Sequence, residues 1–200
     1  MMPRQLLLTT LLLCVILTLS ACVQQRSSST LSPLAPEMSD GLQPGLVPRY
    51  FAKFFSRTVG ALPDDDTSRY KSRLGEPILK LDNQFGRGEV FGSGSNRGVG
   101  IRMRGFLHFP VPGAYTFQAF SNDGIKMYVA ETLLVNDPVQ HSDQLSPEAT
   151  MTIPAAGWYP VQIEYFQRKG TAALKLYWKT PEKQTMEIVP AAAYAHMPAS

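Results

Sequence analysis

Apolar and polar side chains alternate along most of the second half of the chain. The alternating runs cover residues 99–103, 115–119, 125–129, 159–165 and 174–178. A β-strand directs successive side chains to opposite faces, so each run predicts a strand with one buried face. Glycine and proline separate the runs at short intervals, and no run has the period of a long amphipathic helix. The pattern therefore predicts an all-β domain, an antiparallel β-sandwich or barrel with at most one short helix.

A short helix and a glycine-rich loop are expected in the first half of the domain. Asp66 is of a type that caps helices and Gly75 of a type that ends them, which predicts a helix from residue 66 to residue 73. Residues 85–98 follow with the sequence FGRGEVFGSGSNRG. This stretch lacks the lysine-serine ending and the following helix of a phosphate-binding loop, so we expect an irregular loop.

The N-terminus carries an apolar segment unlike the rest of the chain. Residues 6–19 are apolar apart from threonines, and the run is too short to span a membrane comfortably, which is typical of a secretory signal. The next residues end in Ser20-Ala21-Cys22, which resembles the bacterial lipobox. The resemblance implies a signal peptide over residues 1–21 and a lipid on Cys22. An ordinary signal peptide with an incidental cysteine is the alternative. Val23 at the next position implies the outer membrane by the rule known from enteric bacteria.

The remaining chain divides into a tether, a domain and a tail. Residues 22–44 begin with the lipidated cysteine, are rich in Ser, Pro and Gln, and show no period, which predicts a flexible tether. The domain covers residues 45–195 and the tail residues 196–200. Neither of the two cysteines lies in the domain, so the fold contains no disulfide. The net charge of +3 permits contact with anionic glycans or lipid head groups and does not require nucleic acid.

Several stretches of the domain resemble one family in the same order. They are GLVPRYF (45–51), LDNQFGRG (81–88), the central run 101–129, the hairpin 155–178 and IVPAAAY (188–194). The family is the protective-antigen fourteen-kilodalton domain, which occurs in glycosidases, fungal adhesins and bacterial surface proteins. This sequence departs from its pattern at residue 85, where phenylalanine replaces the usual tryptophan. The resemblance implies a β-sandwich or barrel fold, and it often implies carbohydrate binding.

The resemblance also implies a candidate glycan and calcium site. In the fungal adhesins, two adjacent aspartates joined by a cis peptide hold a calcium ion that orients sugar hydroxyls. Asn122 and Asp123 fall on their positions, and Gln167 is expected in the second contributing loop. Calcium prefers six to eight oxygen ligands with carboxylates among them, but here an amide replaces one carboxylate. Arg168 and Lys169 in the second loop would repel a cation, so charge favours a simple turn over a calcium site.

A second candidate site is a basic patch. Arg102 and Arg104 share one face of a predicted strand, and Lys126, Arg168 and Lys169 are expected near the same edge. Such a patch would suit an anionic glycan or a partner protein. The alternative is a solvated strand face on which arginine stems cover apolar surface.

Aromatic side chains divide between the two phases of the predicted strands. Tyr165 and Trp178 fall on the core phase, whereas Phe120, Tyr128, Phe166 and Tyr177 fall on the other phase. Exposed rings would provide faces for stacking on sugars, and rings buried against the other half of the fold would add to the core.

Catalytic chemistry has little support in the sequence. The three histidines, His108, His141 and His196, are scattered, and no serine lies in a nucleophile elbow. Nothing sets a pair of carboxylates at the separation that glycoside hydrolysis needs. We therefore expect a domain that is not an enzyme.

These features together predict a lipoprotein of the bacterial outer membrane whose domain binds a cell-wall or extracellular glycan. The alternative is a non-catalytic accessory subunit that docks on an envelope secretion or pilus complex through protein contacts. In either case we expect a membrane contact through the lipid anchor, no nucleic acid, and no cofactor unless the site at Asn122 and Asp123 holds calcium.

Overall fold

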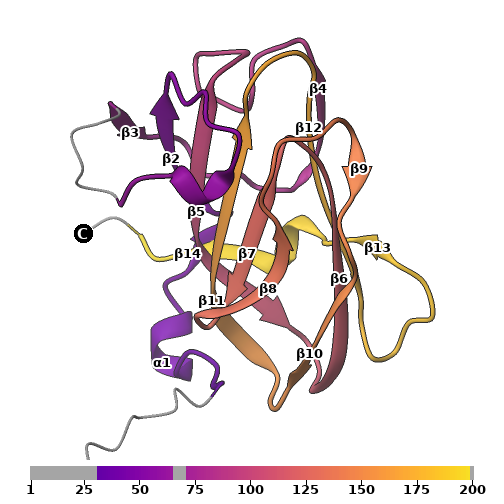
Figure 1. Cartoon of the computed structure of the whole chain (residues 1–200). Helices are drawn as coiled ribbons and strands as arrows, with labels where there is room; N and C mark the ends of the chain where they lie inside the picture. The colour runs from indigo at the N-terminus through magenta and orange to yellow at the C-terminus, as the bar shows by residue number, and fades with distance from the viewer. Residues whose placement is uncertain (1–30, 65–70, 199–200) are drawn as a thin grey trace, which may run out of the picture.

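The computed structural model describes residues 31–64 and 71–198. The predicted signal peptide, the lipidation site Cys22 and the first part of the tether lie outside these residues. Two antiparallel β-sheets pack face to face (Figure 1), which confirms the predicted all-β sandwich. None of the helices in the described part of the chain is long and apolar enough to cross a membrane.

The first sheet has the strand order β1-β14-β5-β11-β7-β8, with β2 beside β5 and β3 beside β2. Its strands are β1 (Gln43–Pro44), β2 (Val47–Ala52), β3 (Ser72–Leu74), β5 (Val99–Phe109), β7 (Ile125–Val129), β8 (Thr132–Asp137), β11 (Gly157–Gln167) and β14 (Tyr194–His196). The long strand β5 pairs with β11 on one edge and with both β2 and β14 on the other.

The second sheet has the order β10-β6-β12-β13, with β4 beside β12 and β9 beside β6. Its strands are β4 (Asp82–Gly86), β6 (Gly113–Asn122), β9 (Gln144–Leu145), β10 (Ala149–Ile153), β12 (Ala172–Lys179) and β13 (Glu187–Ile188). Helical structure in the described residues is limited to α1 (Pro36–Ser39) and the short 3-10 helices η1 (Val59–Ala61) and η2 (Ala191–Ala193).

The core lies between the two sheets and is filled by the alternating apolar residues. Met103, Phe117, Met127, Ile163 and Leu176 are all completely buried. Burial of such a side chain contributes about 1.5–3 kcal/mol, so these strands supply a large share of the stability. Tyr165 and Trp178 are also buried in this core, as their phase predicts.

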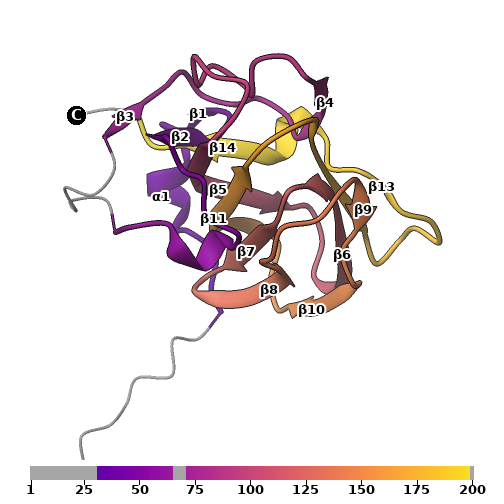
Figure 2. The same cartoon turned by 45° about the horizontal axis from the view of Figure 1, so that its top comes forward.

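A smaller apolar cluster covers one end of the outer face of the first sheet. It consists of Phe51, Phe54, Val59, Leu62 and Phe166. The segment that carries η1 lies outside the sheet beside β7 and β11 (Figure 2) and packs Phe54 edge-on against Phe166, with ring centroids 5.9 Å apart. Phe166 is therefore buried although it falls on the non-core phase of its strand, because a distant segment supplies a second apolar layer.

The structure differs from three local expectations. The last two residues of the helix expected over 66–73, Ser72 and Arg73, lie in strand β3, where Arg73 pairs with Tyr50, and residues 65–70 lie outside the described part. Part of the expected tether contacts the domain, because the Leu34 N–H donates a 2.6 Å hydrogen bond to the Trp158 carbonyl oxygen. His196, expected in the tail, is buried in β14. Isolated backbone contacts of this kind leave no periodic pattern in a sequence.

Candidate functional site

A cleft of about 770 Å³ opens at the end of the sandwich where β6, β8 and β11 finish. We call it the loop cleft. Its walls are residues 139–142, residues 169–171 and the side chains of Arg57 and Arg87, and Asn122 and Asp123 line it from the end of β6. The structure thus brings two of the three predicted glycan-site residues into one concave surface. This end of the sandwich is at the top of Figure 1.

Asp123 connects the two sheets at the base of the loop cleft. The peptide bond between Asn122 and Asp123 is cis, and the chain passes here from β6 in the second sheet to β7 in the first. Oδ2 of Asp123 accepts a 2.7 Å hydrogen bond from the Arg168 N–H. Burial raises the pKa of Asp123 above its ordinary value, although backbone hydrogen bonds and the charges of Arg168 and His141 act in the opposite direction.

Asn122 joins three segments of the site through its amide and its carbonyl. Its Nδ2 donates to Oδ1 of Asp143 at 2.7 Å and to Oγ1 of Thr171 at 3.0 Å. Its carbonyl oxygen accepts a 2.5 Å hydrogen bond from the Tyr165 hydroxyl. Burial raises the pKa of Tyr165 well above its ordinary value, so the hydroxyl stays protonated and remains a donor.

Gly124 allows the loop between β8 and β9 to approach this turn closely. A Cβ atom at Gly124 would lie 2.7 Å from the carbonyl carbon of Pro138 and 2.7 Å from the carbonyl oxygen of Val139. Gly124 does not have a positive φ, so the turn needs glycine for space rather than for a left-handed conformation. The triplet 122–124 is therefore a turn between sheets and at the same time part of the cleft.

His141 holds the loop between β8 and β9. Its Nδ1 lies 2.7 Å from the Ser142 carbonyl oxygen, and its Nε2 lies 3.2 Å from Oδ2 of Asp137. Asp137 also accepts a 3.2 Å hydrogen bond from Nε2 of Gln144. The sequence contained no pattern that marked this histidine, since its partners, Asp137 at the end of β8 and Ser142 in the following loop, belong to no recognisable motif.

Gln167 does not line the loop cleft. Its side chain is completely buried, and its Nε2 contacts the Gly170 carbonyl oxygen at 3.4 Å. Its Oε1 has no hydrogen-bond partner within residues 31–64 and 71–198. Gln167 is therefore separated from Asn122 and Asp123 in the cleft, because β11 continues through residue 167 and the side chain lies beneath the 168–171 loop.

The predicted basic patch does not form one surface. Arg102 is only 5% exposed, and its Nη2 pairs with Oε1 of Glu164 at 2.9 Å. Arg104 and Lys126 lie on the same outer face of the first sheet, opposite Gln162 and Glu164 of β11 in the register. Arg168 and Lys169 lie beyond the end of β11 instead, and of these five side chains only Lys169 lines the loop cleft. The alternation of side chains correctly placed Arg102, Arg104 and Lys126 on one face of the sheet. It did not show that β11 ends at Gln167, before Arg168 and Lys169.

Two of the three cations in the loop cleft, Arg57 and Arg87, are not marked by any pattern in the sequence. Arg57 lies in the segment before η1, and Arg87 follows β4, so neither is near the other or near Lys169 in the sequence. The Arg57 carbonyl oxygen accepts a 2.9 Å hydrogen bond from the Gln140 N–H, which fixes that segment beside the β8–β9 loop. Only the tertiary fold gathers these positive charges.

The donor set of the loop cleft does not fit calcium. Oδ2 of Asp123 is engaged by a backbone N–H, and Asn122 directs its amide nitrogen toward Asp143. Among the described residues, no three acidic, histidine or cysteine side chains gather closely enough to hold a metal ion. Calcium needs six to eight oxygens, and the neighbouring Arg and Lys side chains would oppose its charge.

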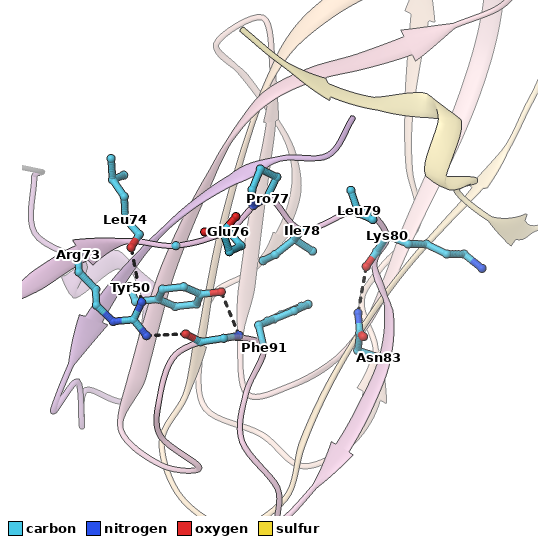
Figure 3. Close-up of a pocket in the computed structure, with 12 residues that line it drawn as sticks. Tyr50, Arg73, Leu74, Glu76, Pro77, Ile78, Leu79, Lys80, Asn83 and Phe91 are labelled. Carbon is cyan, nitrogen blue, oxygen red and sulfur yellow. Dashed lines mark hydrogen bonds between the residues drawn. The ribbon is translucent and has the colours of Figure 1, made fainter. Parts of the chain in front are cut away.

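A second hollow of about 700 Å³ lies between β2, β3 and residues 75–83 (Figure 3). At its edge Nη2 of Arg73 donates to the Gly92 carbonyl oxygen, and the Gly92 N–H donates to the Tyr50 hydroxyl at 3.2 Å. The guanidinium of Arg73 also lies over the Tyr50 ring, 5.0 Å from its centroid. The hollow contains none of the predicted site residues, and these contacts anchor the glycine-rich loop.

The sequence is similar to one protein family and to one curated protein. The sequence model of a family described as the PA14 domain matches residues 42–191. Anti-sigma-I factor RsgI3 of Acetivibrio thermocellus is 27% identical over 130 residues, which are 62% of this chain and 19% of that relative. The chain thus spans about a fifth of the length of this relative.

Solved structures show the same fold. An anti-sigma factor domain-containing protein from Clostridium clariflavum matches with a TM-score of 0.62 at 18% identity, over 79% of this chain and 49% of that chain. The Epithelial Adhesin 6 A domain from Candida glabrata, solved in complex with Galb1-3GlcNAc, matches with a TM-score of 0.58 at 12% identity, over 80% and 89% of the two chains.

Proposed function

Because this chain belongs to the PA14 domain family, we propose that its β-sandwich binds carbohydrate. The observation that carries the proposal is the loop cleft, a concave surface of about 770 Å³ where residues 139–142, residues 169–171 and the turn after β6 meet. It contains Asn122 and Asp123, at the positions where the resemblance to fungal adhesins implies the sugar site. An adhesin with the same fold was solved in complex with a disaccharide, which supports this assignment.

The lining of the loop cleft suits sugar hydroxyl groups. Ser142 and Thr171 provide hydroxyls that both donate and accept, and Gln140 provides an amide. Ser142 and Thr171 are exposed. The hydrogen bonds that pin the three loops reduce the ordering that binding would require.

We further propose that the domain is displayed in the bacterial envelope as a lipoprotein of the outer membrane. The signal-like residues 1–21 and the lipobox cysteine Cys22 support this location. The residues between the lipid and Leu31 would then separate the domain from the bilayer. The domain acts as a binding module and has no catalytic role.

Docking on an envelope protein is the second candidate function. The observation that favours it is the rim of the second hollow, where Leu74 is 59% exposed and Leu79 is 56% exposed. Exposed apolar side chains beside a concave surface are typical of protein contacts. This candidate places the partner on β3 and leaves the loop cleft unused.

A glycan array with a steric block tests the carbohydrate proposal. The mature chain is applied with calcium and again with a chelator, together with Ser142→Trp, which fills the loop cleft. Thr152→Trp is the control, because Thr152 is also exposed but lies on β10 at the opposite end of β6. We expect wild type and T152W to bind the same glycans and S142W to lose at least about tenfold in affinity. Absence of glycan binding in both conditions, or undiminished binding by S142W, overturns the proposal.

A further inference from the structure

Positive charge is concentrated at the loop cleft. Arg57, Arg87 and Lys169 line it, and all three are exposed. An adjoining hollow of about 410 Å³ shares Arg87 and Lys169 and adds Arg97 and Asn96 to its lining. The two hollows therefore form one continuous basic surface that runs past the sugar-site position.

The fold supplies little negative charge against these cations. Within the described ranges, neither Arg57, Arg87 nor Lys169 has an ion pair with a carboxylate. Asp123 is the acidic residue that lines the cleft, but it is only 2% exposed and its carboxylate is turned toward the Arg168 N–H. Asp143 is exposed nearby and accepts the Asn122 amide. The cleft surface that a ligand meets is thus mainly basic.

The backbone around these cations is held in place. The Arg87 carbonyl oxygen accepts a 3.2 Å hydrogen bond from Nδ2 of Asn96, and the Arg57 carbonyl oxygen accepts one from Gln140. The Gly98 N–H donates at 3.0 Å to the Arg168 carbonyl oxygen, next to Lys169. Like charges held together by a fold repel one another, so an anion between them is favourable. Guanidinium groups match carboxylate and sulfate groups with two parallel hydrogen bonds.

We propose that the loop cleft binds acidic glycans, which carry carboxylate or sulfate groups, without calcium. Arg57, Arg87 and Lys169 contact the acid group, and Gln140, Ser142 and Thr171 contact sugar hydroxyls. The cationic side chains thereby stand in for the ion that the resemblance implied. A glycan fits better than nucleic acid, because among the described residues lining the cleft there is no Phe, Tyr or Trp on which a base would stack. The proposal rests on the proposed carbohydrate-binding function.

A series of matched polymers tests this inference. The mature chain is titrated with dextran, carboxymethyl-dextran and dextran sulfate, with a chelator present throughout. We expect at least about tenfold tighter binding to the two acidic polymers than to dextran, and a steep loss of affinity as salt rises, because salt screens the contacts between the cations and the sulfate or carboxylate groups. Poly-glutamate, an anion without sugar, is expected to bind at least about tenfold more weakly than carboxymethyl-dextran.

Charge-removing variants assign the site. The triple variant Arg57→Gln, Arg87→Gln, Lys169→Gln is compared with Lys80→Gln, Lys179→Gln, Lys183→Gln, which removes the same charge far from the cleft. We expect the first to lose at least about tenfold in affinity for the acidic polymers and the second to lose less than about twofold. Thermal unfolding checks that both variants fold.

The outcomes separate this inference from the function on which it rests. If the chain binds neutral and acidic sugars on the array equally well, or binds them only with calcium, the inference is overturned. The proposed carbohydrate function remains intact in both cases. Equal affinity for poly-glutamate, or equal losses in the two triple variants, also overturns it. A chain that binds no glycan at all contradicts both.

Discussion

The Arg168 N–H donates a 2.7 Å hydrogen bond to Oδ2 of Asp123, and this bond joins the loop after β11 to the turn after β6. The Asp123 N–H in turn donates to the Phe166 carbonyl oxygen at 3.0 Å. The backbone N–H and the side-chain carboxylate of Asp123 thus both form hydrogen bonds with the same segment, residues 166–168. Its position in the family implied an ion ligand, whereas its contacts here make it a support for the cleft.

The burial of Asp123 predicts a specific dependence of stability on pH. Because its pKa is raised in the folded state, the native protein favours the protonated carboxyl. The stability that Asp123 contributes is fully present at a pH below its ordinary pKa of 3.8. This stability is lost as the pH rises from 3.8 through the higher pKa of the folded state. Urea unfolding of wild type and Asp123→Asn across this range should show wild type losing stability relative to the variant as pH increases. A difference that grows in favour of wild type with increasing pH contradicts this explanation.

Substitution of two tyrosines of β11 should distinguish a change at the loop cleft from a general loss of stability. The hydroxyl of Tyr165 donates to the Asn122 carbonyl oxygen, and that of Tyr159 donates to the Ala155 carbonyl oxygen at 2.8 Å. Each Tyr→Phe change should cost about 1–2 kcal/mol in the free energy of unfolding, because each removes one hydrogen bond, buried for Tyr165 and part-buried for Tyr159. Only Y165F should also weaken glycan binding, measured by titration, since Ala155 lies at the far end of β11. Equal binding by Y165F and Y159F would show that Tyr165 has no influence on the cleft.

Gly124→Ala should disrupt the packing of the β8–β9 loop. The added Cβ would meet the backbone of Pro138 and Val139, which cannot move as a flexible side chain would, so we expect a loss of about 1–3 kcal/mol. Gly41→Ala is the matched control, because a Cβ there meets nothing within 4 Å. Its effect should stay within about 0.5 kcal/mol in the same urea titration. Similar losses in the two variants would mean that the close approach at Gly124 is not the cause.

The ion pair between Arg102 and Glu164 should dominate the electrostatic stability of the first sheet. Its side chains are only 6% and 10% exposed, and the distance from Nη2 to Oε1 is 2.9 Å. Glu164→Ala removes the carboxylate that pairs with this buried guanidinium, which should cost about 3–5 kcal/mol in chemical denaturation. Glu187→Ala removes the partner of exposed Lys183 and should cost less than about 1 kcal/mol. A small effect of E164A would instead indicate that water or another group solvates Arg102.

Much of the fold is predictable because strand phase is a local property. Met127 and Ile163 are inward simply because alternate residues on a strand face the same way, and both are completely buried. Asn122 and Asp123 could be assigned to a site only through the family resemblance. In the structure both residues line the loop cleft, whereas Gln167 is completely buried and does not line it.

By itself the sequence determined the sandwich, its core residues and its place in a family, because periodic burial and short motifs are encoded by neighbouring residues. The tertiary structure alone decided that Phe166 is buried under the η1 segment and that Arg102 is neutralised by Glu164. It also decided that Arg57, Arg87 and Lys169 line one cleft. These contacts join segments far apart in the chain, and their formation depends on how loops of particular length return to the same end of the sandwich, which no local pattern of residues records.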